Sequence, residues 1–389
     1  MSADVATGAP RLPDLTQYEL EALAGRHNVS DAHAHQRQSR AEQKVIDALP
    51  EIWDRSQALT QADIDKEFIR TFFGFQGQRT MVEAPDRALL CYAASVAMTI
   101  VATQLRLRRA TVTLIEPCFD NLHDILVQNE LPIEPMAEAV LFRSPDVYAA
   151  LAAHGVADVL ILVDPNNPTG ETSFTDGSSR FEEIVRFCAD HRKTLVLDFS
   201  FASFLHSGAR PGRPDVYEIL ERSGVSYMAI EDTGKTWPTQ DVKCGILSAS
   251  ADIWAQVRDL HTGVLLNVSP FALSVLTGFI EASASEGFGS VLDLLAQNRR
   301  VLTDALCGTD LEIVPPTAAV SVAWLRLHQG TASELQARLA REGVHVLPGT
   351  HFFWSDHQRG ESYVRIALAR DPAAFAASAE ALRAALMRP

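Results

Sequence analysis

The sequence has 389 residues, of which 47% are hydrophobic, and a formal net charge of −15 at pH 7. This length allows one large domain with a full core and a smaller second domain. An acidic surface repels nucleic acid phosphates and anionic lipids, so we expect neither a nucleic acid nor a membrane partner. No apolar run is long enough to cross a bilayer.

The five cysteines are scattered along the chain and include no CxxC pair. This usage is typical of a reduced, intracellular protein without disulfides, and it predicts no zinc or other metal site. The N-terminus lacks the basic segment and apolar stretch of a signal peptide. We therefore expect a cytoplasmic protein.

The first 45 residues are polar and rich in histidine and glutamine, and we expect them to lie outside the core. Thr16 and Glu19 have the spacing of a helix-capping box. Leu20 and Leu23 then predict a short helix that ends at Gly25. This local role is one complete explanation for Thr16 and Glu19.

Three apolar runs follow in the middle of the chain, at 159–163, 194–197 and 227–230. Each ends in turn residues, as expected for strands of a parallel sheet that is buried on both faces. The segments between them have helical spacing, and the apolar face of the first is formed by Phe181, Ile184, Val185 and Cys188. The second has Val216, Ile219 and Leu220 on one face and ends at Gly224. This βαβαβ order predicts an α/β fold with a mostly parallel sheet.

The pattern changes after about residue 269. A long helical stretch runs toward Leu306, and the rest of the chain alternates strands with helices. The expected strands are 321–327, 344–347 and 363–367; the expected helices are one closed by Gly343 and one starting at Pro372. We interpret residues 1–45 as an N-terminal segment, 46–270 as a large domain, and 271–389 as a small α/β domain with its linking helix.

Distinctive polar residues follow the three central strands. The first strand precedes the sequence DPNNPTG, which contains Asn167; the second ends at Asp198; the third leads into EDTGK, which ends at Lys235. Ligands of such sheets bind at the carboxyl ends of the strands. An amide, a carboxylate and an amine should therefore converge on one cleft.

These groups match the needs of pyridoxal 5'-phosphate (PLP). A lysine must form a Schiff base with the PLP aldehyde. A carboxylate must keep the pyridine nitrogen protonated, so that the ring can accept electrons. An amide should hold the ring oxygen, and the phosphate needs a helix N-terminus and a cation.

From residue 45 onward, the chain resembles the fold-type I aminotransferases, whose signature combines NNPTG with a later aspartate and lysine. The resemblance implies that Lys235 forms the Schiff base, Asp198 faces the pyridine nitrogen and Asn167 binds the ring oxygen. Further matches imply a set of cofactor-binding residues: Ala94 and Ser95 in the phosphate loop, Phe119 stacked on the ring, Ser200 and Phe201 after the aspartate, and Lys243 at the phosphate. Arg365 resembles the arginine that binds the substrate carboxylate. The resemblance also implies a homodimer with its sites at the subunit interface.

Each of these residues also has a structural explanation. NNPTG can be a turn, Asp198 a helix cap and Lys235 a surface lysine. Phe119 can be a core aromatic residue, and Arg365 can belong to a structural ion pair. Only the joint occurrence of the first three at strand ends, in the right order, favours the cofactor site.

Three features depart from an ordinary aminotransferase. Phe201 takes the place of a tyrosine whose hydroxyl holds the ring oxygen. Asp232 takes the place of a serine or threonine, and we expect its carboxylate to face a cation or to pair with Lys243. No tyrosine occurs in 67–80, where a phosphate ligand from the partner subunit is often found.

The N-terminal motifs LTQYE and NVSDAH, together with EDTGKTWPT around Lys235, resemble one subgroup of the family. This subgroup comprises the PLP-dependent L-arginine oxidases and hydroxylases of antibiotic pathways, enduracididine biosynthesis among them. The resemblance implies that the N-terminal segment is a lid over the site. It also implies that Thr16, Glu19 and Asp31 help bind the substrate, that Asp232 joins them at the guanidinium, and that His33 lies near the reacting carbons.

The expected function is therefore the PLP- and O2-dependent oxidation of L-arginine to 4-hydroxy-2-oxoarginine, 2-oxoarginine or a dehydro-oxoarginine. An ordinary aminotransferase that acts on a cationic amino acid with a 2-oxoacid acceptor is the main alternative. A PLP-binding regulatory protein without turnover is a third, which the complete set of Lys235, Asp198 and Arg365 disfavours.

Overall fold

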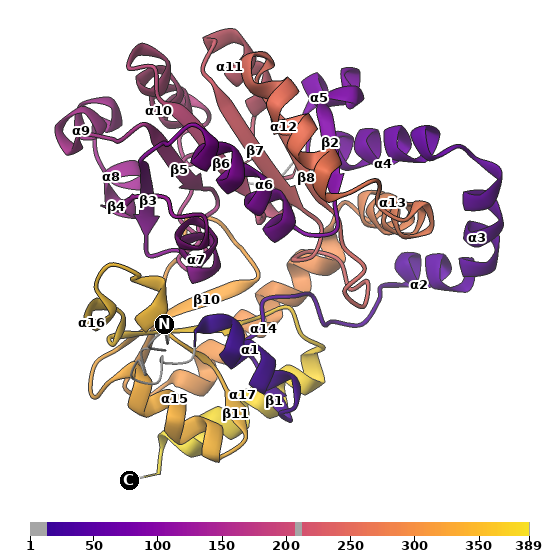
Figure 1. Cartoon of the computed structure of the whole chain (residues 1–389). Helices are drawn as coiled ribbons and strands as arrows, with labels where there is room; N and C mark the ends of the chain where they lie inside the picture. The colour runs from indigo at the N-terminus through magenta and orange to yellow at the C-terminus, as the bar shows by residue number, and fades with distance from the viewer. Residues whose placement is uncertain (1–13, 207–211, 389) are drawn as a thin grey trace, which may run out of the picture.

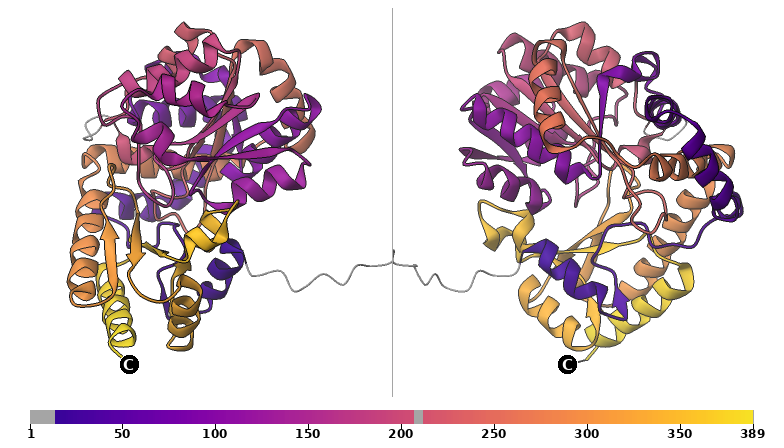
Figure 2. Two further views of the ribbon diagram at one scale, coloured as in Figure 1. Left: turned by 90° about the vertical axis from the view of Figure 1, so that its left-hand side faces the viewer. Right: turned by 45° about the vertical axis from the view of Figure 1, so that its right-hand side comes forward.

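The computed structural model describes residues 14–206 and 212–388. Two lobes lie one above the other in Figure 1, each built around its own β-sheet. Residues from the first half of the chain dominate the upper lobe, and the C-terminal residues dominate the lower lobe (Figure 2). The N-terminal helix α1 (Leu15–Leu23) lies against the lower lobe, beside the short strand that follows it in sequence.

The upper lobe contains a seven-stranded sheet in the order β2-β8-β7-β6-β5-β3-β4. Within it, β8 runs antiparallel to both of its neighbours, and the remaining pairs are parallel. The strands are β2 (Ala88–Cys91), β3 (Val112–Glu116), β4 (Ile133–Ala137), β5 (Val159–Val163), β6 (Thr194–Phe199), β7 (Tyr227–Asp232) and β8 (Gly245–Ala249). The predicted α/β fold with a mostly parallel sheet is confirmed, and the three predicted central strands are β5, β6 and β7.

Helices cover both faces of this sheet, which is why β5 and β7 are buried along their whole length. On one face α6 (Ala94–Leu107) contacts α7 (Asp120–Gln128) and α12 (Ala251–Val264). On the other, α10 (Ser179–Asp190) contacts α9 (Val147–His154) and α11 (Val216–Ser223). The predicted apolar face of α10 is buried, and α11 ends at Gly224, which adopts a left-handed conformation with φ of 69°.

Two long helices, α13 (Pro270–Ser285) and α14 (Gly289–Leu306), lead into the lower lobe. Its antiparallel sheet has the order β12-β13-β10-β9, and α15 and α17 pack beside it. These elements are β9 (Leu311–Val314), β10 (Val322–Leu327), α15 (Ala332–Arg341), β12 (Leu347–Pro348), β13 (Tyr363–Ala367) and α17 (Pro372–Leu386).

The predicted single strand over 344–347 is wrong, because the chain divides there between two sheets. Its first half, β11 (Val344–His345), pairs in parallel with β1 (His27–Asn28) of the N-terminal segment. Its second half, β12, pairs with β13. The N-terminal segment thus provides a partner that the local apolar pattern could not reveal.

The expectation that residues 1–45 lie outside the core is also wrong for the described part of that segment. Leu15, Val29 and Ala32 are buried, and the last two belong to the main core cluster. The capping box forms between Asp14 and Gln17 rather than between Thr16 and Glu19, so the latter pair is not needed for capping. Residues 1–13 lie outside the described part of the chain.

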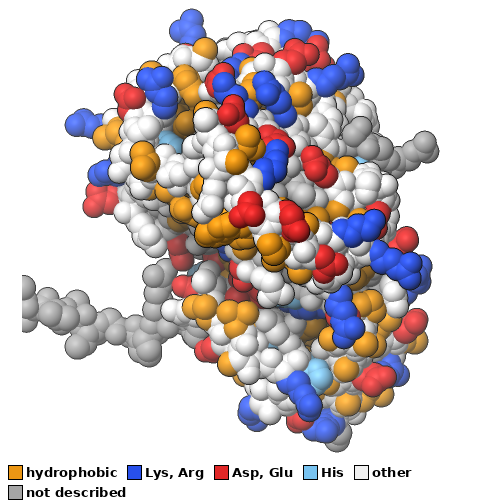
Figure 3. All heavy atoms as spheres, turned by 90° about the vertical axis from the view of Figure 1, so that its right-hand side faces the viewer, with side chains coloured by type: hydrophobic (Ala, Val, Ile, Leu, Met, Phe, Trp, Pro, Cys, Tyr) orange, Lys and Arg blue, Asp and Glu red, His pale blue; other side chains and the backbone are white. Residues whose placement is uncertain are grey.

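The segment continues into three helices, α2 (Arg40–Asp47), α3 (Leu49–Ala58) and α4 (Gln61–Phe75), which form an arm beside α13. On the face in Figure 3, acidic, basic and hydrophobic side chains are interspersed over both lobes. None of the helices in the described ranges is long and apolar enough to span a bilayer.

Candidate active site

A cavity of about 240 Å³ lies where the carboxyl ends of β5, β6 and β7 face the lower lobe and the N-terminal segment. Every residue expected at the site lines this cavity, apart from Asp31. The upper lobe supplies the residues expected to contact the cofactor, and Thr16, Glu19 and His33 enter from the N-terminal segment. Residues more than 300 positions apart therefore meet at one site.

The N-terminus of α6 forms one wall of the cavity through Ala94 and Ser95. No side chain caps this helix, so its first amide groups are available to an anion. Gly245 on β8 passes so close that a Cβ atom there would lie 2.6 Å from the carbonyl carbon of Ala93 and 2.7 Å from the amide nitrogen of Ala94. The lack of a side chain at this position lets β8 support the start of the helix.

Asp198 lies at the end of β6, and its Oδ1 accepts hydrogen bonds from the amide of Ser200 at 2.9 Å and the hydroxyl of Ser200 at 2.5 Å. Burial raises the pKa of Asp198, while the bonds from Ser200 oppose the shift. The Ser200 hydroxyl is thereby occupied in holding Asp198. The carboxylate is fixed in orientation and is poorly solvated, as suits a partner for a protonated ring nitrogen.

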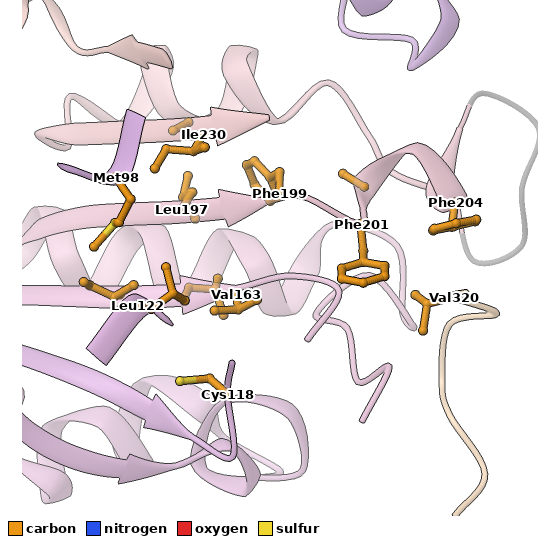
Figure 4. Packing of buried hydrophobic residues seen from close by; sticks show 14 of the residues in the cluster. Met98, Cys118, Leu122, Val163, Leu197, Phe199, Phe201, Phe204, Ile230 and Val320 are labelled. Carbon is orange, nitrogen blue, oxygen red and sulfur yellow. The ribbon is translucent and has the colours of Figure 1, made fainter. Parts of the chain in front are cut away.

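Phe201 follows directly, and it is 2% exposed. Its ring lies beyond the end of β6 among Phe204, Val320 and other core residues (Figure 4). Phe201 contributes a hydrophobic wall to the cavity and offers no hydroxyl. Phe119, from the opposite side, also lines the cavity and packs edge-on against Phe352 of the lower lobe.

Lys235 is half-buried in the loop after β7, which excludes the surface-lysine explanation. Its Nζ lies 3.3 Å from Nε2 of His33, and Nζ of Lys243 lies 3.2 Å from the same nitrogen. Two amines therefore flank one imidazole from the N-terminal segment. Lys243 lines the cavity together with the N-terminus of α6, as expected for a phosphate ligand.

Arg365 on β13 is fully buried. Its Nη1 donates to Oδ1 of Asn167 at 3.1 Å, and its Nη2 donates to Oε1 of Glu19 at 2.8 Å and to the carbonyl of Ser30. The guanidinium lies 5.5 Å from the ring centre of Phe119. Arg365 therefore joins the NNPTG loop to the N-terminal helix inside the cavity.

Asp232, at the end of β7, is 4% exposed and also lines the cavity. Its Oδ1 is buried without a hydrogen-bond partner, and Nζ of Lys243 contacts Nε2 of His33 at 3.2 Å instead of this carboxylate. The alternative of an Asp232–Lys243 pair is thus wrong. A buried carboxylate with an unsatisfied oxygen favours a cationic group in the cavity.

Asp31, which is expected to help bind the substrate, does not line the cavity, and this role stays a prediction. Its two carboxylate oxygens contact Nδ1 of His33 at 2.7 Å and Nε2 of His35 at 2.5 Å. Burial alone would raise the pKa of Asp31, but these bonds outweigh it and hold the pKa well below its usual range. Asp31 is therefore an ionised partner of two histidines.

The loop that presents Asn167 is held by a residue that sequence reasoning missed. Oε2 of Glu138 accepts from Nδ2 of Asn166 and from Oγ1 of Thr169, each at 2.7 Å. Burial raises the pKa of Glu138 to about 7. No spacing rule connects positions 138 and 166, so only the tertiary fold reveals this contact.

Several further cavity residues were not expected from the sequence. The apolar ones are Met98, Leu122, Val163 and Ile230. Asn121 adds a polar group in the first turn of α7. Its position two residues after Phe119 was the one feature of the sequence that could have indicated a place at the site. The apolar residues resemble any others in the core.

The model of the aminotransferase class I and II family matches residues 35–382. A solved structure of MppP soaked with the product 2-ketoarginine is 32% identical in sequence, with a TM-score of 0.85 that covers 93% of this chain and all of that one. An archaeal alanine:glyoxylate aminotransferase shares the fold, with a TM-score of 0.79. Its sequence is 15% identical, and the match covers 97% of this chain and 96% of that one. The match to MppP, whose product is 2-ketoarginine, thus confirms the resemblance predicted within this family.

Two curated relatives are aminotransferases. LL-diaminopimelate aminotransferase 2 of Trichormus variabilis is 28% identical over 54% of this chain and 52% of its own length. L-glutamine--4-(methylsulfanyl)-2-oxobutanoate aminotransferase of Bacillus subtilis is 26% identical over 54% and 51%. The chain aligns with about half the length of these curated relatives. The family model and the MppP match cover almost all of it, and the chain belongs to the aminotransferase class I and II family.

Proposed function

We propose that this protein is a PLP-dependent oxidase of L-arginine that uses O2 and releases 2-oxoarginine, 4-hydroxy-2-oxoarginine or a dehydro-oxoarginine. One observation carries the proposal: the cavity places the buried, unsatisfied carboxylate of Asp232 with Lys235 and Arg365, beneath residues of the N-terminal segment. The likeness to MppP, whose product is 2-ketoarginine, supports the same substrate.

The donor set of the cavity fits PLP. The free amides of α6, which β8 approaches closely at Gly245, offer an anion site beside Lys243. Asp198 suits the ring nitrogen, and Lys235 the aldehyde. When bound, PLP supplies a ring that stabilises negative charge at the substrate Cα.

The residues of this chain would then bind and orient the amino acid. Arg365 offers a guanidinium fork to the substrate carboxylate, and Asp232 faces the cationic side chain. Nζ of Lys235 removes the proton from Cα, and Nε2 of His33 lies close enough to receive it. Thr16 and Glu19, on the helix that covers the cavity, help exclude bulk water.

The atoms balance with O2 as oxidant. Arginine, O2 and water give 2-oxoarginine, ammonia and hydrogen peroxide. A second O2 and a second water add the 4-hydroxyl group and release a second peroxide. The peroxide therefore distinguishes this reaction from a transfer of the amino group to a 2-oxoacid.

The decisive experiment is oxygen consumption by the PLP-loaded protein with L-arginine and without a 2-oxoacid. We expect sustained uptake with peroxide formation, and mass spectrometry of the mixture then identifies the product. Turnover that requires a 2-oxoacid and consumes no oxygen would instead establish an aminotransferase. That second candidate is favoured by the curated relatives, which are aminotransferases.

The homodimer, the cytoplasmic location and the domain boundaries at residues 45 and 270 stay predictions. So does a role in antibiotic biosynthesis. Sedimentation of the PLP-loaded protein tests the first of them directly.

A further inference from the structure

The carboxylate of Asp31 is shared by two imidazoles. Nδ1 of His33 lies 2.7 Å from Oδ1, and Nε2 of His35 lies 2.5 Å from Oδ2. The amide of His33 also donates to Oδ1 at 3.0 Å. An ionised carboxylate can only accept hydrogen bonds, so both ring nitrogens that face it must carry hydrogen.

This arrangement selects one tautomer of His33. With hydrogen on Nδ1, a neutral imidazole has a free electron pair on Nε2. Nε2 is the atom that faces the amines of Lys235 and Lys243, at 3.3 and 3.2 Å. The other tautomer would direct an N–H group at two amines and leave Asp31 facing an electron pair.

The backbone around the three residues is fixed from two sides. Arg370 donates through Nη1 to the carbonyl of His33 at 3.0 Å and through Nη2 to the carbonyl of Asp31. The amide of His35 donates to the carbonyl of Ala369 at 3.0 Å. Because the main chain is held, the main freedom left to Asp31 is rotation of its side chain, which two imidazoles restrain better than one.

We propose that His35 is a positioning residue for His33, because its bond to Asp31 keeps the carboxylate oriented so that His33 presents Nε2 to Lys235. His35 does not line the cavity, and its side chain is 37% exposed, so it acts through Asp31 rather than on the substrate.

The catalytic consequence rests on the proposed function. After Lys235 has taken the proton from Cα, an N–H bond of its ammonium group breaks and a bond from that proton to Nε2 of His33 forms. Asp31 stays ionised and balances the positive imidazolium, as in other histidine–carboxylate pairs. If Asp31 were misoriented, Nε2 of His33 would no longer be available to accept the proton from Lys235. The substrate contacts of Arg365 and Asp232 would remain.

The test compares the PLP-loaded protein with its His35→Ala, His35→Leu and His35→Gln variants. Alanine and leucine remove the donor, and leucine keeps most of the bulk; glutamine keeps an N–H donor. His154→Ala, at the exposed end of α9, is the matched control. The side-chain 15N NMR spectrum reports the tautomer of His33, assigned by comparison with His33→Gln.

We expect the Nδ1–H tautomer of His33 in the parent protein, in His35→Gln and in the control, and a mixture of tautomers in His35→Ala and His35→Leu. Arginine turnover should fall about tenfold in the last two, with KM changed by less than about twofold, and glutamine should restore it. An unchanged tautomer in His35→Ala overturns the proposal, as does a glutamine variant that behaves like alanine. Because the NMR readout needs no turnover, it tests His35 even if the protein proves not to oxidise arginine.

Discussion

The carboxylate of Glu19 lies 2.8 Å from the guanidinium of Arg365, so an ion pair joins the N-terminal helix to β13 inside the cavity. Arg365 is fully buried, and the side chain of Glu19 is only 15% exposed. Separating such a pair is costly unless another carboxylate replaces Glu19. An amino acid substrate brings that carboxylate, and its cationic end then offers Glu19 a new partner.

Glu19→Gln should therefore change the binding of two ligands in opposite directions. L-Alanine, which has a carboxylate but no cationic side chain, should bind about 3–10-fold more tightly, because Arg365 no longer has to release Glu19. L-Arginine should bind about 3–10-fold more weakly, because it loses a carboxylate partner. Titrations of the PLP-loaded protein followed by absorbance measure both. Glu21→Gln, at an exposed position of the same helix, is the control, and equal shifts for both ligands would contradict the exchange.

Asp232→Asn should reduce the discrimination between L-arginine and its uncharged analogue L-citrulline. The buried Oδ1 of Asp232 lacks a partner, and a guanidinium would satisfy it with a charge-assisted bond. Loss of that bond should lower kcat/KM for arginine by about 10–100-fold and change that for citrulline far less. Competition assays with both substrates provide the ratio. Asp241→Asn, on the exposed part of the same loop, should leave the ratio unchanged.

The sequence predicted the central strands and the clustering of the expected cofactor residues because both depend on short-range patterns. The apolar runs that became β5, β6 and β7 are buried on both faces, and the residues after them project into one cleft. Lys235, Asp198 and Asn167 could thus be placed together without knowledge of the rest of the fold.

The position of the N-terminal segment, in contrast, could not be predicted from the sequence. Its polar composition predicted a peripheral position, yet the carbonyl of Val29 accepts from the amide of Ala367, and β1 pairs with β11. Main-chain hydrogen bonds of this kind do not depend on side-chain pattern, so composition cannot reveal them. The sharing of Asp31 between two histidines is likewise a product of tertiary position.

Gly245→Ala should weaken PLP binding by an order of magnitude or more and lower the stability of the protein. A Cβ atom at this position would meet the backbone of Ala93 and Ala94 at 2.6–2.7 Å, so β8 or the start of α6 has to move. A shift of the first turn displaces the amides expected to bind the phosphate. Dialysis followed by absorbance measures retained PLP.

The control is Gly263→Ala in α12, where a Cβ atom would meet nothing within 4 Å. This substitution should stabilise the helix by about 0.5–1 kcal/mol. Normal PLP retention in Gly245→Ala would show that the contact is not needed.

Asp120→Asn should change how stability depends on pH, because burial raises the pKa of Asp120 to about 7 in the native protein. Asp120 is 4% exposed and accepts a hydrogen bond from the amide of Leu15, which anchors α1. Between its unfolded pKa of about 4 and pH 7 the native state binds more protons, so the contribution of Asp120 to stability is lost as pH rises through this window. Asparagine cannot ionise, so the variant should gain stability relative to the parent between pH 5 and 8, by about 1–3 kcal/mol. Urea unfolding at several pH values measures the difference in free energy of unfolding between the parent and the variant. Burial also raises the pKa of Glu138 and Asp164, but both proteins retain these residues, so they contribute little to the difference. The exposed variant Asp176→Asn should show no such trend, and a difference that stays constant with pH would mean that Asp120 is already ionised at pH 5.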